Sequence, residues 1–599
     1  MKGPFAFGTV YSRNPLTGEK KIFCSLYTEN SPQRIDQTVI PKKVLDKIET
    51  ELKNKEREVG FIVEALIIFD RGYDKYTIKQ YISAKIEYTL YPKVLVAFLE
   101  EGMINEQELI RKIPLDIISA WFTSQVIDTL GAPKLLEAKS LSPGASIGMI
   151  AHSRSDVKHL LSEGLTPIWV IGEVSTEDLK YFSKVGGIVL TQSGVTSHAA
   201  IVAKSTGVPT LLGGEVLLDE SYKNRLVTID GNNGLIYGGK TIINGNNKDQ
   251  YIKQILNIAK RNCGFIIKAN ADTGYEYKKA QSYLAKGIGL CRTEHMFKDP
   301  KRTSQIRTQL FAENKDLRNL DHIQRSQQQD FQNIFDQNDG ELIVIRYLDA
   351  PLHEFLPHSE KEKDDFAKVL NITRPQIDRI IKKWTEKNPM LGYRAARMLL
   401  LNKDFVILQT KAILTAAEKY FQMNNAVLRL GLEIPLVIGA NEVKEFKNVI
   451  NQYIRKKDIN KKIKVSFGAM IETPLAITNI AEIAKEVDFI SYGTNDLVQT
   501  YFAISRDDSD TFIESYVEQG FLKVNPFVNI SGTEIIEILK QSSEKAKSVN
   551  SDIIIGLCGE QGSNPETIQE LVNTKIDYLS VSPALVPITY LASAKAFVQ

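Results

Sequence analysis

Six polar side chains stand at the ends of apolar, strand-like runs in the second half of the chain, and their types suit one kind of chemistry. Arginine guanidinium groups bind carboxylate and phosphate groups through paired hydrogen bonds. Carboxylate oxygens suit a partly hydrated Mg²⁺ ion, and a thiol beside them can move a proton to or from carbon. Together they predict a small ligand with carboxylate and phosphate groups, a description that phosphoenolpyruvate fits. The residues are Arg292, Arg346, Glu472, Asn495, Asp496 and Cys558.

These side chains need a scaffold that brings the ends of several strands together. Between residues 263 and 599, eight apolar runs alternate with helical patterns such as AILTAAEKYFQ. This alternation predicts an α/β fold with a C-terminal (β/α)₈ barrel, whose functional residues lie at the C-terminal strand ends. An open doubly wound sheet is the alternative, but the Gly-rich turn expected after an early strand is missing. The runs are FIIKANA, GIGLCRT, LIVIRYLDA, EIPLVIGAN, KVSFGAMIET, DFISYGTND, DIIIGLCGE and DYLSVSP.

A further candidate lies outside this region. The stretch SGVTSHAA, residues 193–200, places His198 between an apolar run and an amphipathic helix. Thr196 or Ser197 can cap a helix that begins near His198, which leaves free backbone N–H groups there. The helix dipole keeps the imidazole neutral and nucleophilic, and it stabilises an attached phosphate. We therefore predict that His198 carries a phosphoryl group; the alternative is a plain residue of a capping turn.

Length and composition bound the domain organisation. At 599 residues the chain should divide into about three or four domains. Pro and Gly in SLSPGASIG and the polar NGNNKDQ mark two boundaries. The predicted order is a small α+β domain (1–88), a helical linker that includes ISAWFTSQVIDTLG (89–138), a domain of alternating strands and helices (139–245) and the barrel (246–599).

Charge and cysteine usage exclude several classes of protein. A net charge of +3 gives no case for a nucleic-acid or membrane partner, and the Lys run KKVLDKIETELKNKEREVG alternates with acids, as on a solvated helix face. The four scattered cysteines favour a reducing compartment over a disulfide framework. No signal-peptide core and no 18-residue apolar run is found. We expect a cytoplasmic protein, although signal-independent secretion would leave no mark here.

Five motifs resemble the phosphoenolpyruvate-utilising enzymes, more closely pyruvate, phosphate dikinase than enzyme I of the sugar phosphotransferase system. The motifs are GIGLCRTEHMF, YLDAPLHEFLPH, NPMLGYRAARM, SYGTNDL and GLCGEQGSNP. GVTSHAAIVAKSTGVPTLLG, residues 194–213, is similar to the mobile phosphohistidine domain of that family. The resemblance spans about 140–599, and it implies a Mg²⁺-dependent phosphotransferase with phosphoenolpyruvate and pyruvate as ligands.

The resemblance also implies roles for single residues. His198 would carry the phosphoryl group, and Cys558 would protonate the enolate at its methylene carbon. Glu472 and Asp496 would bind Mg²⁺. The residues that would bind the substrate are Arg292, Arg346, Arg394, Gly493, Thr494, Asn495 and Asp496. Thr196 matches a position that is a control site in some dikinases, and the family tends to form homodimers through its barrel.

The chain departs from the family pattern at its N-terminus and beside the thiol. SRNPLTGEKKIF, residues 12–23, resembles the end of an ATP-grasp nucleotide-binding half, but Ser25 and Ser31 then stand where Glu and Gln are expected. Residues 1–88 are therefore expected to be a degenerate ATP-grasp remnant that binds no ATP by itself. In the barrel, Ala350 replaces a proline and Gln561 replaces a common histidine next to the loop of Cys558.

Three functions stay open from the sequence. In the first, phosphoenolpyruvate phosphorylates His198 and the phosphoryl group passes to an unidentified acceptor. In the second, the chain is one subunit of a split dikinase with a separate ATP-grasp partner. In the third, it is a regulatory protein that binds phosphoenolpyruvate without turnover.

One nucleotide-binding motif is rejected. GLIYGGKT, residues 234–241, matches G-x-x-x-x-G-K-[ST], but that pattern needs a strand before it and a helix after it. Asn233 and Gly234 instead predict a hairpin turn between RLVTI and LIY, and IINGNN predicts no helix.

Overall fold

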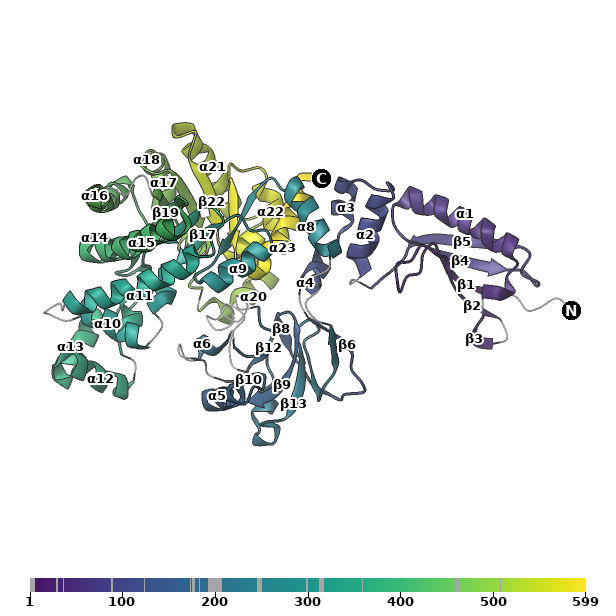
Figure 1. Cartoon of the computed structure of the whole chain (residues 1–599), viewed down its shortest axis with the longest axis horizontal. Helices are drawn as coiled ribbons and strands as arrows, with labels where there is room; N and C mark the ends of the chain where they lie inside the picture. The colour runs from purple at the N-terminus through teal and green to yellow at the C-terminus, as the bar shows by residue number, and fades with distance from the viewer. Residues whose placement is uncertain are drawn as a thin grey trace. The chain divides into compact units, whose positions relative to one another are not determined.

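The computed structural model describes most of the chain, which packs into two compact units (Figure 1). Unit 1 comprises Met1–Gln125, Asn244–Asn262 and Phe597–Gln599, and unit 2 comprises Val126–Ile243 and Cys263–Ala596. The domain boundaries predicted near residues 88, 138 and 245 stay predictions. The described residues are 6–28, 31–35, 37–87, 90–122, 124–172, 174, 178–182, 184–191, 207–244, 250–297, 300–311, 317–357, 359–457, 463–506 and 508–598.

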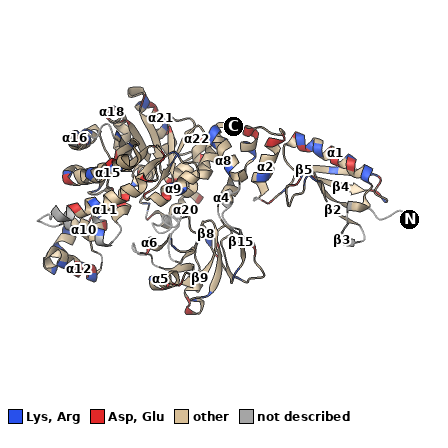
Figure 2. Cartoon of the chain, viewed as in Figure 1, with Lys and Arg blue, Asp and Glu red and all other residues tan. Residues whose placement is uncertain are grey.

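The N-terminal part of unit 1 is an antiparallel sheet with one long helix on one face. In the described residues the strand order is β3-β2-β1-β4-β5. Helix α1 (Lys42–Val59) buries Val44, Ile48 and Leu52, spaced four residues apart, in the apolar cluster of the sheet. Its remaining surface mixes both signs of charge, as the alternating Lys run predicts (Figure 2). The strands are β1 (Ala6–Tyr11), β2 (Phe23–Thr28), β3 (Ser31–Ile35), β4 (Val63–Phe69) and β5 (Tyr76–Ser83).

The predicted helical linker is partly wrong. Helices α2 (Tyr91–Glu100), α3 (Glu106–Lys112) and α4 (Ile118–Trp121) are present, but the run ISAWFTSQVIDTLG does not continue as a helix. It becomes strand β6 (Gln125–Asp128), which pairs with β15 (Ile242–Asn244). The β-branched Val126 favours this extended backbone. Helix α8 (Gln250–Asn262) belongs to unit 1.

Within unit 2, the strands between residues 134 and 238 form a mixed sheet whose central strands contribute alternate residues to two apolar clusters. In the described residues its order is β7-β14-β13-β9-β10-β11-β12-β8, with β9 to β12 parallel. Every residue of β10 is buried, which explains why the run is continuously apolar. The elements are β7 (Lys134–Glu137), β8 (Lys139–Ser142), β9 (Ala145–Ala151), α5 (Arg154–Ser162), β10 (Pro167–Ile171), α6 (Leu179–Phe182), β11 (Gly187–Leu190), β12 (Thr210–Leu212), β13 (Leu226–Asp230) and β14 (Leu235–Gly238).

The hairpin predicted in place of a nucleotide loop is confirmed. Strands β13 and β14 pair antiparallel, and β15 rather than a helix follows. Gly234, in the turn, has a φ of +71°, and a Cβ atom there would lie 2.4 Å from the carbonyl oxygen of Ala138. The glycine therefore serves a tight turn against the neighbouring backbone.

The predicted barrel is confirmed. In the described residues, strands β16 to β23 close into a barrel in which each strand pairs in parallel with its two neighbours. The strands are β16 (Ile266–Asn270), β17 (Ile288–Arg292), β18 (Ile343–Arg346), β19 (Leu428–Ile434), β20 (Ile463–Ile471), β21 (Phe489–Gly493), β22 (Ile554–Cys558) and β23 (Tyr578–Val581). The helices are α9 (Gly274–Ser282), α10 (Pro300–Phe311), α11 (Leu317–Phe335), α12 (Glu360–Leu370), α13 (Arg374–Trp384), α14 (Ala395–Leu401), α15 (Lys403–Asn424), α16 (Ala440–Lys457), α17 (Pro474–Thr478), α18 (Ile480–Ala484), α19 (Thr494–Phe502), α20 (Ile513–Glu518), α21 (Glu534–Val549), α22 (Pro565–Leu571) and α23 (Val586–Val598).

The fourth barrel strand ends earlier than its apolar run predicts. The run EIPLVIGAN predicts a strand over 433–441, whereas β19 ends at Ile434, directly before Pro435. Proline has no N–H group to donate to a sheet ladder, so the strand ends there.

Two aromatic rings fill the barrel interior against glycines. A Cβ atom on Gly556 would lie 1.9 Å from Cζ of Tyr578, and one on Gly468 would lie 2.1 Å from Cζ of Phe489. Glycine at these two positions leaves room for the rings, which make the interior a packed core rather than a pore. Of the described helices, none has the length and apolar character that crossing a membrane requires.

Candidate active site

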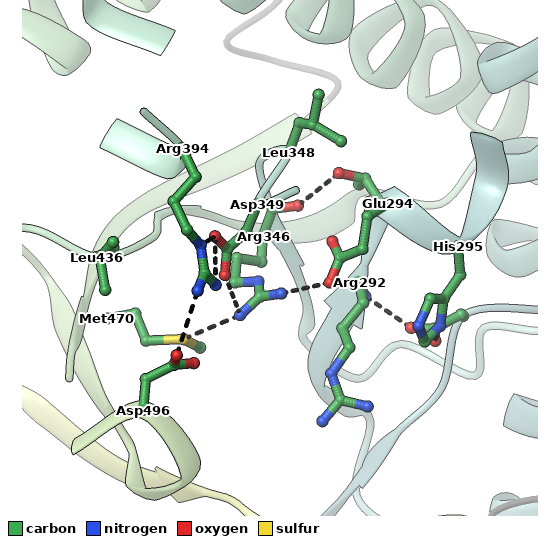
Figure 3. Close-up of polar contacts among 12 residues, drawn as sticks. Arg292, Glu294, His295, Arg346, Leu348, Asp349, Arg394, Leu436, Met470 and Asp496 are labelled. Carbon is green, nitrogen blue, oxygen red and sulfur yellow. Dashed lines mark hydrogen bonds and ion pairs between the residues drawn. The ribbon is translucent and has the colours of Figure 1, made fainter. Parts of the chain in front are cut away.

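Asp349 joins two arginines at the C-terminal rim of the barrel (Figure 3). Arg346 ends β18, and Arg394 precedes α14. Asp349 Oδ1 accepts a hydrogen bond from Nε of Arg394 at 2.8 Å, and its Oδ2 lies 3.0 Å from Nη1 of Arg346. Burial opposes ionisation of Asp349, but the two guanidinium groups outweigh it and hold its pKa below the usual value. Asp349 therefore fixes both arginines as a rigid cationic pair.

The end of β17 adds a third arginine, Arg292, and the turn after it adds a second carboxylate, Glu294. Nη2 of Arg346 donates to Oε1 of Glu294 at 2.5 Å. The backbone N–H of Arg292 donates to Asp272, whose other oxygen lies 2.6 Å from Nδ1 of His295. The Arg292 guanidinium itself makes no hydrogen bond to a described residue, and Figure 3 shows it pointing away from the Arg346 cluster. Arg292 is therefore available to an anionic ligand.

Glu472 and Asp496 bring two further carboxylates to the same rim. Glu472 follows β20, and its Oε1 accepts from the backbone N–H of Leu436 at 2.7 Å. Asp496 lies in the first turn of α19, 3.3 Å from Nη1 of Arg394. Burial raises the pKa of Glu472 well above its usual value, and the neighbouring carboxylates raise it further. A divalent cation would relieve this repulsion, so the residues fit Mg²⁺.

The two carboxylates do not form a complete cage for a metal. Among the described residues, no three His, Cys, Asp or Glu side chains are grouped so that they could hold an ion by themselves. Mg²⁺ commonly keeps several waters and binds through one or two carboxylates together with substrate phosphate oxygens. The two carboxylates of Glu472 and Asp496 agree with this mode of Mg²⁺ binding.

The junction between β21 and α19 carries Gly493, Thr494 and Asn495. Thr494 Oγ1 donates to Oε1 of Gln561 at 2.8 Å. Nε2 of Gln561 lies 3.3 and 3.2 Å from the carbonyl oxygens of Pro526 and Phe527, to which it donates. Gln561, which departs from the family pattern, is thus a buried residue whose hydrogen bonds link the loop after Cys558 to the junction between β21 and α19. Asn495 is half-buried beside it.

Cys558 ends β22 with its side chain inside the barrel. The residue is 3% exposed, and Sγ donates to the carbonyl oxygen of Gly289 at 3.6 Å. Burial raises the pKa of the Cys558 thiol to about 12, and Glu433 contributes to the rise. At neutral pH the group is therefore a protonated thiol that can act as an acid.

The structure brings most of the proposed residues to one rim and adds partners that the sequence did not single out. Asp349 and Glu294 were missed as site residues, although both lie inside the motifs YLDAPLHEFLPH and GIGLCRTEHMF. Their signal was their position, within three residues of Arg346 and Arg292. His198 and Thr196 lie outside the described residues, so their roles stay predictions.

Comparisons with known proteins agree with this geometry. The PEP-binding domain of PEP-utilising enzymes matches residues 246–597, and the mobile domain of PEP-utilising enzymes matches residues 166–234. Pyruvate, phosphate dikinase of Rickettsia bellii is 31% identical over 99% of this chain and 71% of its own length. The dikinase of Clostridium symbiosum is 28% identical over 98% of this chain and 70% of its own length. The match to half of the chain and more shows that this protein belongs to the PEP-utilising enzyme family.

Proposed function

We propose that this phosphotransferase moves a phosphoryl group from phosphoenolpyruvate to His198, releases pyruvate, and passes the phosphoryl group to an acceptor that remains to be identified. The observation that carries the proposal is the barrel rim, which holds a guanidinium without a hydrogen bond to any described residue, a fixed pair of guanidiniums, two repelling carboxylates and a buried thiol. Each element matches one part of the ligand: anionic groups, a Mg²⁺ ion and a carbon that takes a proton.

In this mechanism the arginines hold and orient the substrate. Arg292 binds the phosphate, because its guanidinium makes no hydrogen bond to a described residue. Arg346 and Arg394, fixed by Asp349, bind the remaining negative charge. Asn495 positions the substrate, with Gly493 and Thr494 forming the turn that carries it. Holding the reactants in one geometry is a large part of phosphoryl-transfer catalysis.

Glu472 and Asp496 would hold Mg²⁺, which when bound offsets the negative charge of the enolate and phosphate oxygens. Cys558 then donates its proton to the methylene carbon of the enolate, which gives pyruvate. Because its pKa is raised to about 12, the thiol retains its proton at neutral pH until the methylene carbon of the enolate accepts it.

The test is transfer of labelled phosphate. Incubation with phosphoenolpyruvate carrying ³²P, in the presence of Mg²⁺, should give an acid-labile label on the protein and one pyruvate per label. His198→Ala should abolish the label. His159→Ala is the matched control, because the His159 side chain is 68% exposed on α5, where its Nε2 lies 3.5 Å from Oε1 of Glu163. Label that survives His198→Ala would remove the proposal.

The other two functions give different outcomes in the same assay. Binding of phosphoenolpyruvate by calorimetry without pyruvate release would favour a regulatory protein. Formation of phosphoenolpyruvate from pyruvate, ATP and phosphate only after addition of a second polypeptide would favour a split dikinase. Neither outcome is expected if phosphoenolpyruvate phosphorylates His198 and pyruvate is released.

A further inference from the structure

The turn that begins at Arg292, at the end of β17, is held in place through three of its four side chains. Thr293 Oγ1 donates to the carbonyl oxygen of Arg346 at 3.1 Å, and Glu294 accepts from the Arg346 guanidinium. His295 pairs with a carboxylate. The fourth side chain, that of Arg292, makes no hydrogen bond to a described residue (Figure 3). A fixed turn therefore presents one guanidinium that is left for a ligand.

Asp272 binds this turn at both ends. The N–H of Ala271, just after β16, donates to the carbonyl oxygen of Leu290 in β17 at 3.1 Å. Two residues further along β17, Oδ1 of Asp272 accepts the backbone N–H of Arg292 at 2.6 Å, so a side chain continues the pairing where β16 has ended. Oδ2 of Asp272 lies 2.6 Å from Nδ1 of His295. One carboxylate thus fixes the backbone of Arg292 and the side chain three positions later.

Asp272 is itself held in place, and it is charged. Its backbone N–H and that of Thr273 donate to Oε2 of Glu276 in the first turn of α9, at 2.8 and 3.1 Å. Burial opposes ionisation of Asp272, but His295 and Arg292 outweigh it and hold the pKa of this carboxyl below its usual value. At neutral pH Asp272 is therefore a carboxylate that only accepts hydrogen bonds, so the Nδ1–H of His295 donates to it.

We propose that Asp272 and His295 are positioning residues that set the direction of the Arg292 guanidinium, and through it the binding of the anionic group of the ligand. The inference rests on the proposed function, because it needs phosphoenolpyruvate at the rim. Asp272 holds the backbone from which the arginine side chain leaves, and His295 keeps the carboxylate in the orientation that accepts this N–H. A guanidinium that is placed before the ligand arrives loses less conformational freedom on binding, which increases the affinity.

The test is a double-mutant cycle on the binding of phosphoenolpyruvate, measured by calorimetry with Mg²⁺. It uses the full chain with His198→Ala, so that binding is measured without phosphoryl transfer to that residue. Arg292→Ala and Asp272→Ala should each raise the Kd by about 10–100-fold, the range for loss of a hydrogen bond to a charged group. In the Arg292→Ala background, Asp272→Ala should change the Kd by less than about twofold, because Asp272 acts only through Arg292.

Asp577→Ala is the matched control, because Asp577 makes the same two kinds of contact at the opposite end of the barrel. It directly precedes β23, its Oδ2 accepts the backbone N–H of Ile555 at 2.7 Å, and Nζ of Lys547 lies 3.0 Å from the same oxygen. This variant should lower the melting temperature and leave the Kd unchanged. A merely structural role of Asp272 would give the same pattern in Asp272→Ala.

Conservative variants add a rescue to the cycle. Asp272→Asn keeps an oxygen that can accept the N–H of Arg292, and His295→Asn keeps a side-chain N–H donor. Both should bind phosphoenolpyruvate more tightly than the corresponding alanine variants. If Asp272→Ala does not fold, His295→Ala and His295→Asn in the same cycle with Arg292→Ala decide the matter.

Two results would overturn the inference alone. One is an Asp272→Ala protein with the Kd of the Asp577→Ala control. The other is an effect of Asp272→Ala or His295→Ala that is equally large without Arg292, which would mean that the residue acts on the ligand directly. Labelling of His198 in the protein without these substitutions is a separate measurement: coupling to Arg292 in a protein that takes no label would support the inference and refute the phosphoryl step alone. A protein that binds no phosphoenolpyruvate would refute both.

Discussion

A Cβ atom on Gly493 would lie 2.3 Å from Oε2 of Glu472. No side chain can occupy that space unless the carboxylate moves, so the glycine at the end of β21 fixes the position of a candidate metal ligand. We expect Gly493→Ala to weaken Mg²⁺ binding by about 10–100-fold, the usual effect of disturbing a residue that orients a ligand. The Mg²⁺ dependence of pyruvate formation measures this.

Gly439→Ala is the matched control for this substitution. The closest atom to a Cβ there is Nδ2 of Asn479, at 3.7 Å, which is an ordinary contact. The control should keep the wild-type Mg²⁺ dependence. An unchanged Mg²⁺ requirement in Gly493→Ala would contradict the assignment of Glu472 as a ligand.

Asp349→Asn should destabilise the fold and weaken substrate binding together. The substitution leaves Arg346 and Arg394 buried with less negative charge between them, and loss of one member of a buried charge pair costs about 3–5 kcal/mol. Urea unfolding measures the stability, and the KM for phosphoenolpyruvate should rise. Asp365→Asn is the control, because Asp365 is 60% exposed and 3.7 Å from Lys368, so its loss should cost less than about 1 kcal/mol.

The stability difference between wild type and Asp349→Asn should depend on pH in one direction. Because the pKa of Asp349 is lower in the folded state, its contribution is complete above the unfolded value of about 3.9 and is lost as pH falls through the folded value. The difference should therefore be constant from about pH 8 to 5 and shrink in stronger acid. A difference that grows as pH falls would contradict the ion-pair assignment.

The sequence predicts the barrel well because its strands are buried on both sides and appear as continuous apolar runs. It places the fourth strand too late, because EIPLVIGAN is apolar on both sides of Pro435 and only the backbone shows where the ladder ends. It also cannot find Lys268, since hydrophobicity alone would place a lysine at the surface. In the structure Lys268 is only 5% exposed.

The site shows a similar division. Arg346, Glu472 and Cys558 could be predicted because each directly follows or ends an apolar run, where barrel enzymes carry their chemistry. Asp349 stands three residues after Arg346, which was a local signal, but its full role depends on Arg394, which meets it from a separate segment. Charge neutralisation between distant segments is a property of tertiary structure and produces no periodic pattern of residues in the sequence.

Gln561→Ala should loosen the junction that carries Thr494 and Asn495. Gln561 makes one hydrogen bond to Thr494 and two to backbone carbonyls, and leaving such buried groups unpaired costs about 1–3 kcal/mol. We expect a lower melting temperature and a higher KM for phosphoenolpyruvate. Gln541→Ala on the exposed face of α21 is the control and should change neither. Equal melting temperatures of the two variants would show that the hydrogen bonds of Gln561 do not contribute to the stability of the fold.

Cys558 should remain a thiol far above neutral pH. Burial raises its pKa to about 12, so the proton stays bound in the folded state where an unfolded cysteine, with a pKa of about 8.5, would already lose it. The stability that the thiol contributes is complete below about pH 8.5 and is lost as pH rises toward 12. The difference in absorbance at 240 nm between wild type and Cys558→Ala should show no thiolate step between about pH 7 and 10.

The same substitution should remove the carbon acid of the reaction. Pyruvate formation should fall by about 10²–10⁴-fold in Cys558→Ala, the range for loss of a positioned acid. Cys263→Ala is the matched control, because its thiol donates to the carbonyl of Phe265 and to Ser593 before β16 begins, away from the C-terminal strand ends. A thiolate step below pH 9 that Cys558→Ala removes would mean that the interior stabilises the anion, and Cys558 would then act as a base toward pyruvate rather than as an acid toward its enolate.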